Sequence, residues 1–215
     1  VSEPSNPWLA GVNNLFTADF YRLARSRLAP GGVFCQWLQL YEVSPGTLGS
    51  ILAAFLETFP RGHAFMGTDG SDLLLCAMDQ PHALDLARLD DDAARREIQR
   101  AKLPSLDALA GYYVGPFSEL RPLAQGQVHN TDDRPIVEFR APRDMVELGR
   151  VVGGGSQAMA ARLPVARWSD AREVFAGWSA ERWYRARTRE LARTGRTEWT
   201  RKAVDESREQ LGAAF

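Results

Sequence analysis

The first residues of the chain combine side chains suited to chemistry with a backbone that is unsuited to a regular element. They supply one carboxylate, two small polar groups and one large aromatic ring: Glu3, Ser5, Asn6 and Trp8. Pro4 and Pro7 stand among them and disfavour a continuous helix. A carboxylate on a rigid loop can act as a general base. The stretch therefore predicts either a site or an ordinary surface connection.

Each candidate side chain has a structural explanation beside the chemical one. Glu3 either acts on a ligand, as a base or a cation-binding group, or caps a nearby backbone. Asn6 either contacts a substrate or shapes the turn. Trp8 forms the wall of a pocket or, as we favour, a packing plug. Gln36, in the apolar run that follows, either faces the site or has a structural role near the end of a strand.

The elements that must position these residues alternate between helix and strand. Apolar residues recur at helical spacing over residues 17–28, where Thr17 is a suitable N-cap. A largely apolar run at 33–40 predicts a buried strand. Ser44 and Pro45 then begin a helix that Pro60 ends.

Two short strands complete this part of the chain. Residues 63–66 and 72–77 flank the tight-turn signal Asp69-Gly70, which predicts an antiparallel hairpin. Alternating strands and helices predict an α/β fold with a parallel sheet. An antiparallel pair at the end of such a sheet is an accepted variant.

The next segment is more polar. We expect helices that begin near Asp90 and at Pro104, a short helix at 117–123, and a strand or extended segment at 136–139. Asp132 and Asp133 resemble paired carboxylates, but an Asx-type turn anchored by Arg134 is the favoured interpretation.

The C-terminal part predicts a helical tail. A helical pattern at 145–152 and a flexible break at 153–155 come first. Two helices, joined at Gly195, are then predicted over residues 168–194 and 197–214. Arginines and tryptophans there could suit single-stranded nucleic acid. Interleaved glutamates favour a solvated helical hairpin instead.

Composition restricts the classes of function. The chain has 215 residues, 45% of them hydrophobic and 25% charged, and a formal net charge of −1, which predicts no nucleic-acid partner. No apolar run has the length of a membrane span. Cys35 and Cys76 lie in apolar runs and predict buried free thiols in a reducing, cytoplasmic compartment, with a disulfide between neighbouring strands as the less favoured alternative. No Cys/His spacing predicts a metal site.

Several segments together resemble the spermidine synthase-like family. They are SEPSNPW at 2–8, Gly11, LFT at 15–17, Phe20-Tyr21, LAPGGVFCQW at 28–37 and NTDDRPIVEF at 130–139. The resemblance is nearest to the branch in which such a domain stands alone in bacteria or is fused to a membrane transporter-like domain. Residues 1–142 would then be the C-terminal half of a methyltransferase-like Rossmann domain, and 143–215 the helical tail.

That resemblance implies which strands are present. Residues 1–2 would end the fourth strand, 33–40 would form the fifth, and 63–77 the antiparallel sixth and seventh. The order of elements in this domain would thus be helix, strand, helix and an antiparallel pair of strands. The earlier strands are expected upstream of Val1, because the chain begins with valine and directly in a loop.

It also implies a reaction: aminopropyl transfer from decarboxylated S-adenosylmethionine, the co-substrate, to a diamine such as putrescine. No metal is implied. The family's Asp-Ser-Ser/Thr-Asp-Pro loop falls on Glu3, Ser5, Asn6 and Pro7, so Glu3 would be catalytic and Ser5, Asn6, Trp8 and Gln36 would contact the amine. Asn6 replaces an aspartate and Leu9-Ala10 replace a Gly-Pro, which changes the expected preference for the amine.

The nucleoside-binding turns of that fold precede the fourth strand and are expected upstream of Val1. Two alternatives therefore stay open: a methyltransferase-like domain that uses S-adenosylmethionine with another acceptor, and a non-catalytic interaction module. A homodimer also stays open, as does a membrane domain upstream, which would place this domain at the cytoplasmic face of the membrane.

Overall fold

The computed structural model describes residues 1–79 and 92–212. The chain forms two compact units, each built from two separate stretches. The first unit contains Val1–Pro81 and Gly115–Pro164, and the second contains His82–Val114 and Val165–Phe215. The sequence-based division at residue 142 stays a prediction. The start of the helix expected near Asp90 lies outside the described residues, and α3 is described over Asp92–Arg100.

A four-stranded sheet organises the first unit. Its strands are β1 (Val33–Gln39), β2 (Gly62–Met66), β3 (Asp72–Met78) and β4 (Tyr113–Pro116), in the order β1-β3-β2-β4. The chain passes from one unit to the other within β4. β3 pairs antiparallel with both β1 and β2, which confirms the predicted hairpin.

The predicted parallel sheet needs a correction. β1 and β2 run in the same direction, but β3, the return strand of the hairpin, lies between them and makes both of their pairings antiparallel. One parallel bridge is present in the described residues, between Ser2 and Gln36. The observed fold is therefore mixed α and β.

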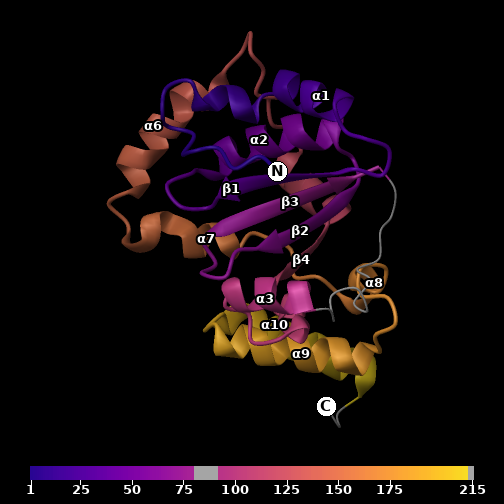
Figure 1. Cartoon of the computed structure of the whole chain (residues 1–215). Coiled ribbons are helices and arrows are strands. Elements are labelled where there is room, and N and C mark those ends of the chain that lie inside the picture. The colour runs from indigo at the N-terminus through magenta and orange to yellow at the C-terminus, as the bar shows by residue number, and fades with distance from the viewer. Residues whose placement is uncertain (80–91, 213–215) are drawn as a thin grey trace. The chain divides into compact units, whose positions relative to one another are not determined.

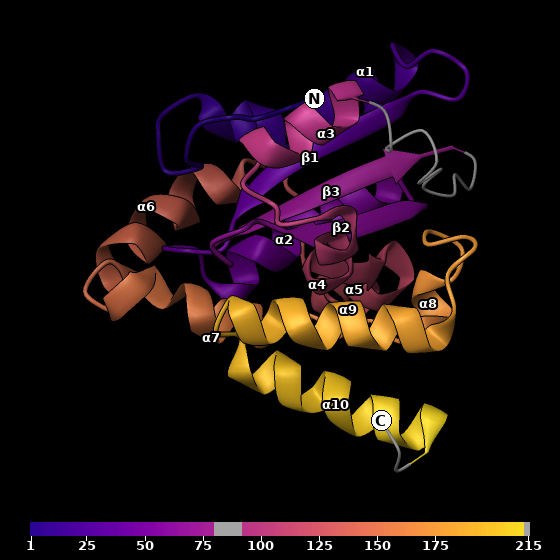
Figure 2. The ribbon, with the colours of Figure 1, turned by 60° about the horizontal axis from the view of Figure 1, so that its bottom comes forward.

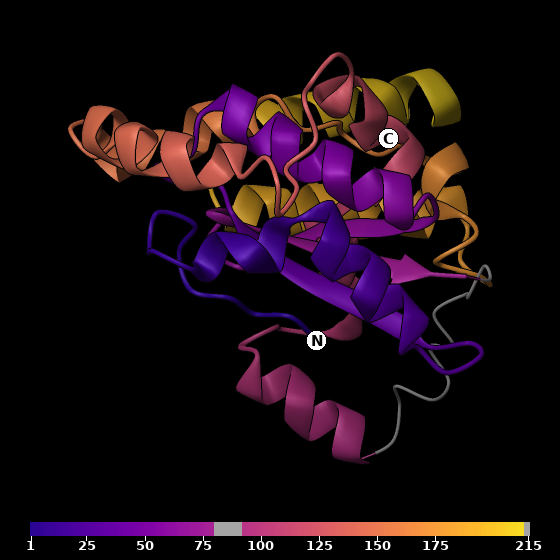
Figure 3. The same ribbon diagram turned by 90° about the horizontal axis from the view of Figure 1, so that it is seen from above.

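Two helices pack on one face of this sheet: α1 (Ala18–Ser26) and α2 (Pro45–Thr58) (Figures 1 and 3). Both begin as predicted, because the side chains of Thr17 and Ser44 accept backbone hydrogen bonds from the first turn. An aromatic core joins helices and sheet through close ring contacts among Tyr21, Phe34, Phe55 and Phe59.

Further helices complete the first unit: η1 (Val12–Phe16), α5 (Phe117–Ala124), α6 (Ile136–Leu148), η4 (Val152–Gly155) and α7 (Ser156–Ala160). The strand expected at 136–139 is wrong, since this segment begins α6. Val137 and Ala141, at i and i+4, are fully buried on one face, and the backbone N–H of Val137 donates to the Asn130 side chain. Pro142 stands inside the helix.

The second unit contains η3 (Leu106–Ala108), α4 (Leu109–Tyr112), α8 (Trp168–Ala171), α9 (Ala180–Arg193) and α10 (Thr197–Leu211). The antiparallel pair α9 and α10 lies side by side, joined at Gly195 as predicted (Figures 1 and 2). The prediction of one continuous helix over 168–194 is wrong. The helical structure is interrupted after α8, where Gly177 adopts a φ of 82° and Ser179 caps α9.

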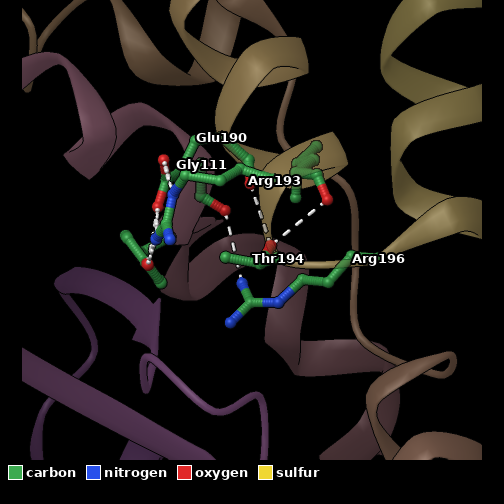
Figure 4. A network of polar contacts seen from close by, with 7 residues as sticks. Gly111, Glu190, Arg193, Thr194 and Arg196 are labelled. Carbon is green, nitrogen blue, oxygen red and sulfur yellow. Dashed lines mark hydrogen bonds and ion pairs between the residues drawn. The ribbon is translucent and has the colours of Figure 1, made fainter. Parts of the chain in front are cut away.

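A polar network ties α9 to α4 within this unit (Figure 4). Tyr112 donates its hydroxyl hydrogen to Oε1 of the buried Glu190 over 2.7 Å, and Arg193 binds both oxygens of the same carboxylate. A Cβ atom at Gly111 would lie 2.5 Å from Cβ of Glu190, so glycine is needed for the close approach of these helices.

Candidate functional site

The opening loop is attached to the sheet through Ser2. Its N–H donates to the carbonyl of Cys35 over 2.7 Å, and its carbonyl accepts from the N–H of Trp37 over 2.9 Å. These two bonds make the parallel bridge to β1. Because the bridge is parallel, the chain leaves Ser2 in the direction in which β1 ends. Glu3 is therefore directed toward the carboxyl edge of the sheet.

The same edge collects residues from three other chain segments. Tyr41 follows the end of β1, and the turn 67–71 joins the end of β2 to the start of β3. Because β3 runs antiparallel, its first residue, Asp72, lies where the neighbouring strands end. The N–H of Leu40 donates to the carbonyl of Ser71 over 2.7 Å, which fixes this register.

Tyr41 connects two of the predicted site residues. Its hydroxyl donates to Oδ1 of Asn6 over 3.2 Å. Its ring packs edge-on against Trp8, with ring centroids 6.1 Å apart. Asn6 is also fixed through its backbone, because its carbonyl accepts from the N–H of Leu9 over 3.0 Å. The loop is thus held to the sheet edge by an aromatic and hydrogen-bonded contact.

The electrostatics of this edge are negative. Burial, followed by the charges of Asp69 and Glu3, raises the pKa of Asp72, although a hydrogen bond from Trp37 lowers it in part. Burial also raises the pKa of Tyr41, and Asp72, Glu42 and Asp69 add to that effect. We call the group the acidic edge and define it by six residues: Glu3, Asn6, Trp8, Tyr41, Asp69 and Asp72.

The acidic edge can attract and hold a cation. Carboxylates placed close together repel one another, and a ligand cation between them relieves that repulsion. Aromatic faces such as those of Trp8 and Tyr41 also attract cations. Asp69 has a second role in shaping the turn, because its carboxylate accepts hydrogen bonds from the N–H and the hydroxyl of Ser71.

The remaining predicted residues lie apart from this group or add little to it. Ser5 is exposed. Gln36 is fully buried and alternates with Phe34 and Leu38 on the buried face of β1. Its Nε2 donates to the carbonyl of Trp37 over 2.9 Å, and its Oε1 has no partner within the described residues. Its role in binding stays a prediction.

Asp132 and Asp133 lie in an exposed turn, but in the described part of the chain neither side chain makes the bond of an Asx-type turn, so that part of the prediction is not confirmed. The turn is fixed by Thr131, whose hydroxyl accepts from the N–H of Arg134 over 3.0 Å. The N–H of Asp132 donates to the carboxylate of Asp19. The two aspartates are on a different segment from the acidic edge.

Sequence reasoning missed Tyr41, Asp69 and Asp72. Asp69 was interpreted only as a turn residue, and the other two had no pattern of their own. A signal was present, however. A hairpin whose turn follows a strand parallel to β1 must deliver that turn to the carboxyl edge, where ligands bind in open α/β sheets.

A hollow of about 450 Å³ lies elsewhere in the first unit, between α2 and α5. It includes the pair His129 and Glu57, in which Nδ1 and Oε2 are 2.7 Å apart, together with Arg121. No residue of the acidic edge lines it.

The described ranges contain no group of three or more His, Cys, Asp or Glu side chains that could hold a metal ion. Within the same ranges, none of the helices has both the length and the apolar character needed to cross a membrane. Comparisons with protein-family models, with curated proteins and with solved structures found no match.

Proposed function

We propose that the acidic edge binds the acceptor amine of an aminopropyltransferase-like reaction. The acceptor would be a diamine such as putrescine, and the donor decarboxylated S-adenosylmethionine. The observation that carries the proposal is that the Ser2 bridge directs Glu3 to the carboxyl edge of the sheet, where Asp72 begins β3 and Tyr41 links Asn6 and Trp8. Such a group suits a ligand with positive charge and an aliphatic chain.

The chemistry needs a neutral amine next to an electrophilic carbon. The amine nitrogen forms a bond to the carbon attached to the sulfonium, the carbon–sulfur bond breaks, and methylthioadenosine leaves. The nitrogen must lose a proton, and Glu3 would accept it. Asp69 and Asp72 would hold the ammonium group at the other end of the diamine, which positions the reacting end.

The sheet topology supports this proposal. A segment parallel to β1 at Ser2, together with an antiparallel pair formed by β2 and β3, is the arrangement that the spermidine synthase-like resemblance implies. The loop of that family follows the strand at the position where Glu3 follows Ser2. The residues assigned here concern the amine, and no residues are assigned to the nucleoside.

Binding of the amine is the first test. Isothermal titration of the full chain with putrescine should give saturable binding that weakens with salt. The Glu3→Gln variant should bind at least about tenfold more weakly, because it loses a charge contact to an ammonium. Glu119→Gln, an exposed change on α5, is the matched control. Equal affinity of all three proteins would remove Glu3 from the amine site.

Turnover is the second test. The protein is mixed with putrescine and decarboxylated S-adenosylmethionine, and methylthioadenosine is measured by chromatography. A parallel reaction uses S-adenosylmethionine and measures S-adenosylhomocysteine. Product in the second reaction alone would replace the proposal with a methyltransferase. Absence of both turnover and amine binding would instead favour an interaction module.

A further inference from the structure

Cys35 and Cys76 lie directly opposite each other on β1 and β3, with their sulfur atoms 3.2 Å apart. The carbonyl of Cys35 accepts from Ser2, so its backbone polar groups point away from β3. In an antiparallel ladder that makes the pair a non-hydrogen-bonded one, the type in which opposite side chains are closest. This geometry needs little backbone movement to form a disulfide.

Both thiols are on the less buried face of the sheet. Their neighbours on that face include Val33 and Leu74, with 45% and 37% of their surface exposed. Cys35 and Cys76 are each half-buried, not fully buried as the sequence predicted. Among the described residues, the face that carries the two sulfur atoms is therefore the more exposed face of β1 and β3.

The two thiols differ in acidity. The hydrogen bond between the two sulfur atoms lowers the pKa of Cys35 to about 7. The same contact, followed by burial, raises the pKa of Cys76. Cys35 is consequently the nucleophile at neutral pH, and Cys76 is placed to react second.

We propose that Cys35 and Cys76 form a redox-active dithiol that oxidised glutathione closes reversibly. The Cys35 thiolate attacks one sulfur of glutathione disulfide, forms a mixed disulfide and releases one glutathione thiolate. Cys76 then loses its proton to solvent and attacks the Cys35 sulfur, which releases the second glutathione. Two protein thiols are oxidised to one disulfide, and one glutathione disulfide is reduced to two glutathione thiolates, which take up the two protons that the protein thiols lose.

The cross-link would join two strands next to the opening loop. Cys35 is also the residue whose carbonyl holds Ser2, and Trp37 on the same strand donates to Asp72. Oxidation would therefore fix β1 against β3 at the point where the acidic edge is attached. This proposal concerns the thiols alone and stands whether or not the acidic edge binds an amine.

Intact mass after alkylation tests the proposal on the full chain. After equilibration with oxidised glutathione in the presence of a chelator, the protein should lose two hydrogens, become protected from alkylation at both cysteines, and form no disulfide between chains. The first thiol should react about fivefold faster than free glutathione does, because its greater thiolate fraction outweighs its lower nucleophilicity. Addition of reduced glutathione should restore both thiols.

Two variants separate the roles of the thiols. Cys76→Ser should accumulate a stable mixed disulfide on Cys35, and Cys35→Ser should remain largely unmodified. The unaltered protein decides the outcome even if a variant fails to fold. Glutathione retained on either cysteine of that protein, a cross-link between two chains, or reaction only in denaturant would each overturn the proposal.

Discussion

Tyr41 donates its hydroxyl hydrogen to Oδ1 of Asn6, and so joins the end of β1 to a loop 35 residues earlier. The contact fixes the side chain of Asn6 at the carboxyl edge of the sheet. The negative charge at this edge is provided by Glu3, Asp69 and Asp72.

Replacing Tyr41 with phenylalanine should weaken the site without removing its aromatic wall. The ring still packs on Trp8, but the loss of one hydrogen bond should cost about 1 kcal/mol, or about fivefold in putrescine affinity. Titration calorimetry measures the affinity, and urea unfolding measures stability. If Tyr41→Phe binds putrescine as tightly as the unchanged protein does, the hydrogen bond from Tyr41 to Asn6 is not needed for binding.

The Asp72→Asn change should stabilise the protein at neutral pH. Because its folded pKa is raised, Asp72 favours the folded state only when protonated; this contribution is complete below the unfolded pKa, near 3.8, and is lost as the pH rises through the folded value. Asparagine removes the repulsion from Asp69 and Glu3.

Urea unfolding at pH 4 and pH 7 measures the effect on the free energy of unfolding. The gain from Asp72→Asn should be larger at pH 7, and putrescine affinity should fall in the same variant. A variant that is destabilised at pH 7 would indicate that the hydrogen bond from Trp37 outweighs the repulsion.

Glu190→Gln should destabilise the second unit by about 2 kcal/mol, because a buried charge-assisted contact is lost. Burial alone would raise the pKa of Glu190, but hydrogen bonds from Arg193 and Tyr112 hold it below its usual value of 4.5. Its contribution is therefore present above pH 4.5 and is lost as the pH falls through the folded pKa.

The matched control for that variant is Glu198→Gln, which breaks an exposed ion pair with Lys202. It should change the free energy of unfolding by less than about 0.5 kcal/mol. Thermal unfolding followed by tryptophan fluorescence compares the variants. Equal effects at Glu190 and Glu198 would contradict the role of the polar network.

Asn130→Ala should destabilise the first unit by about 3 kcal/mol. The buried Asn130 side chain donates to Oδ1 of Asn13 and to the carbonyl of Phe16, and accepts from the N–H of Val137. Alanine would leave these groups buried without partners. Exposed Asp133→Ala, three residues later, is the control and should be nearly neutral in urea unfolding.

Local signals predicted much of the fold. Thr17 and Ser44 begin helices as expected, and Asp69-Gly70 makes the hairpin turn. The predictions of secondary structure failed where contacts with other segments of the chain determine the local conformation. Residues 136–139 are helical because the N–H of Val137 donates to the Asn130 side chain and one face of the helix is buried. The residue pattern of 136–139 alone does not indicate this hydrogen bond.

The candidate site was predicted in part for a similar reason. Glu3, Asn6 and Trp8 were identified from residue type and from the resemblance. Tyr41 and Asp72 join them only through the register between β1 and β3, which places the start of one strand beside the end of the other. Register depends on pairing between distant segments, so single residues do not reveal it.

The discontinuous second unit has a consequence for how the protein folds as it is synthesised. Ribosomes release the chain from its N-terminus, so both stretches of the first unit emerge before α9 and α10 exist. The contacts of Tyr112 with Glu190 and Arg193 can therefore form only after about 80 further residues have been synthesised. Until then α4, which contains Gly111 and Tyr112, lacks the helix that covers it in the complete protein.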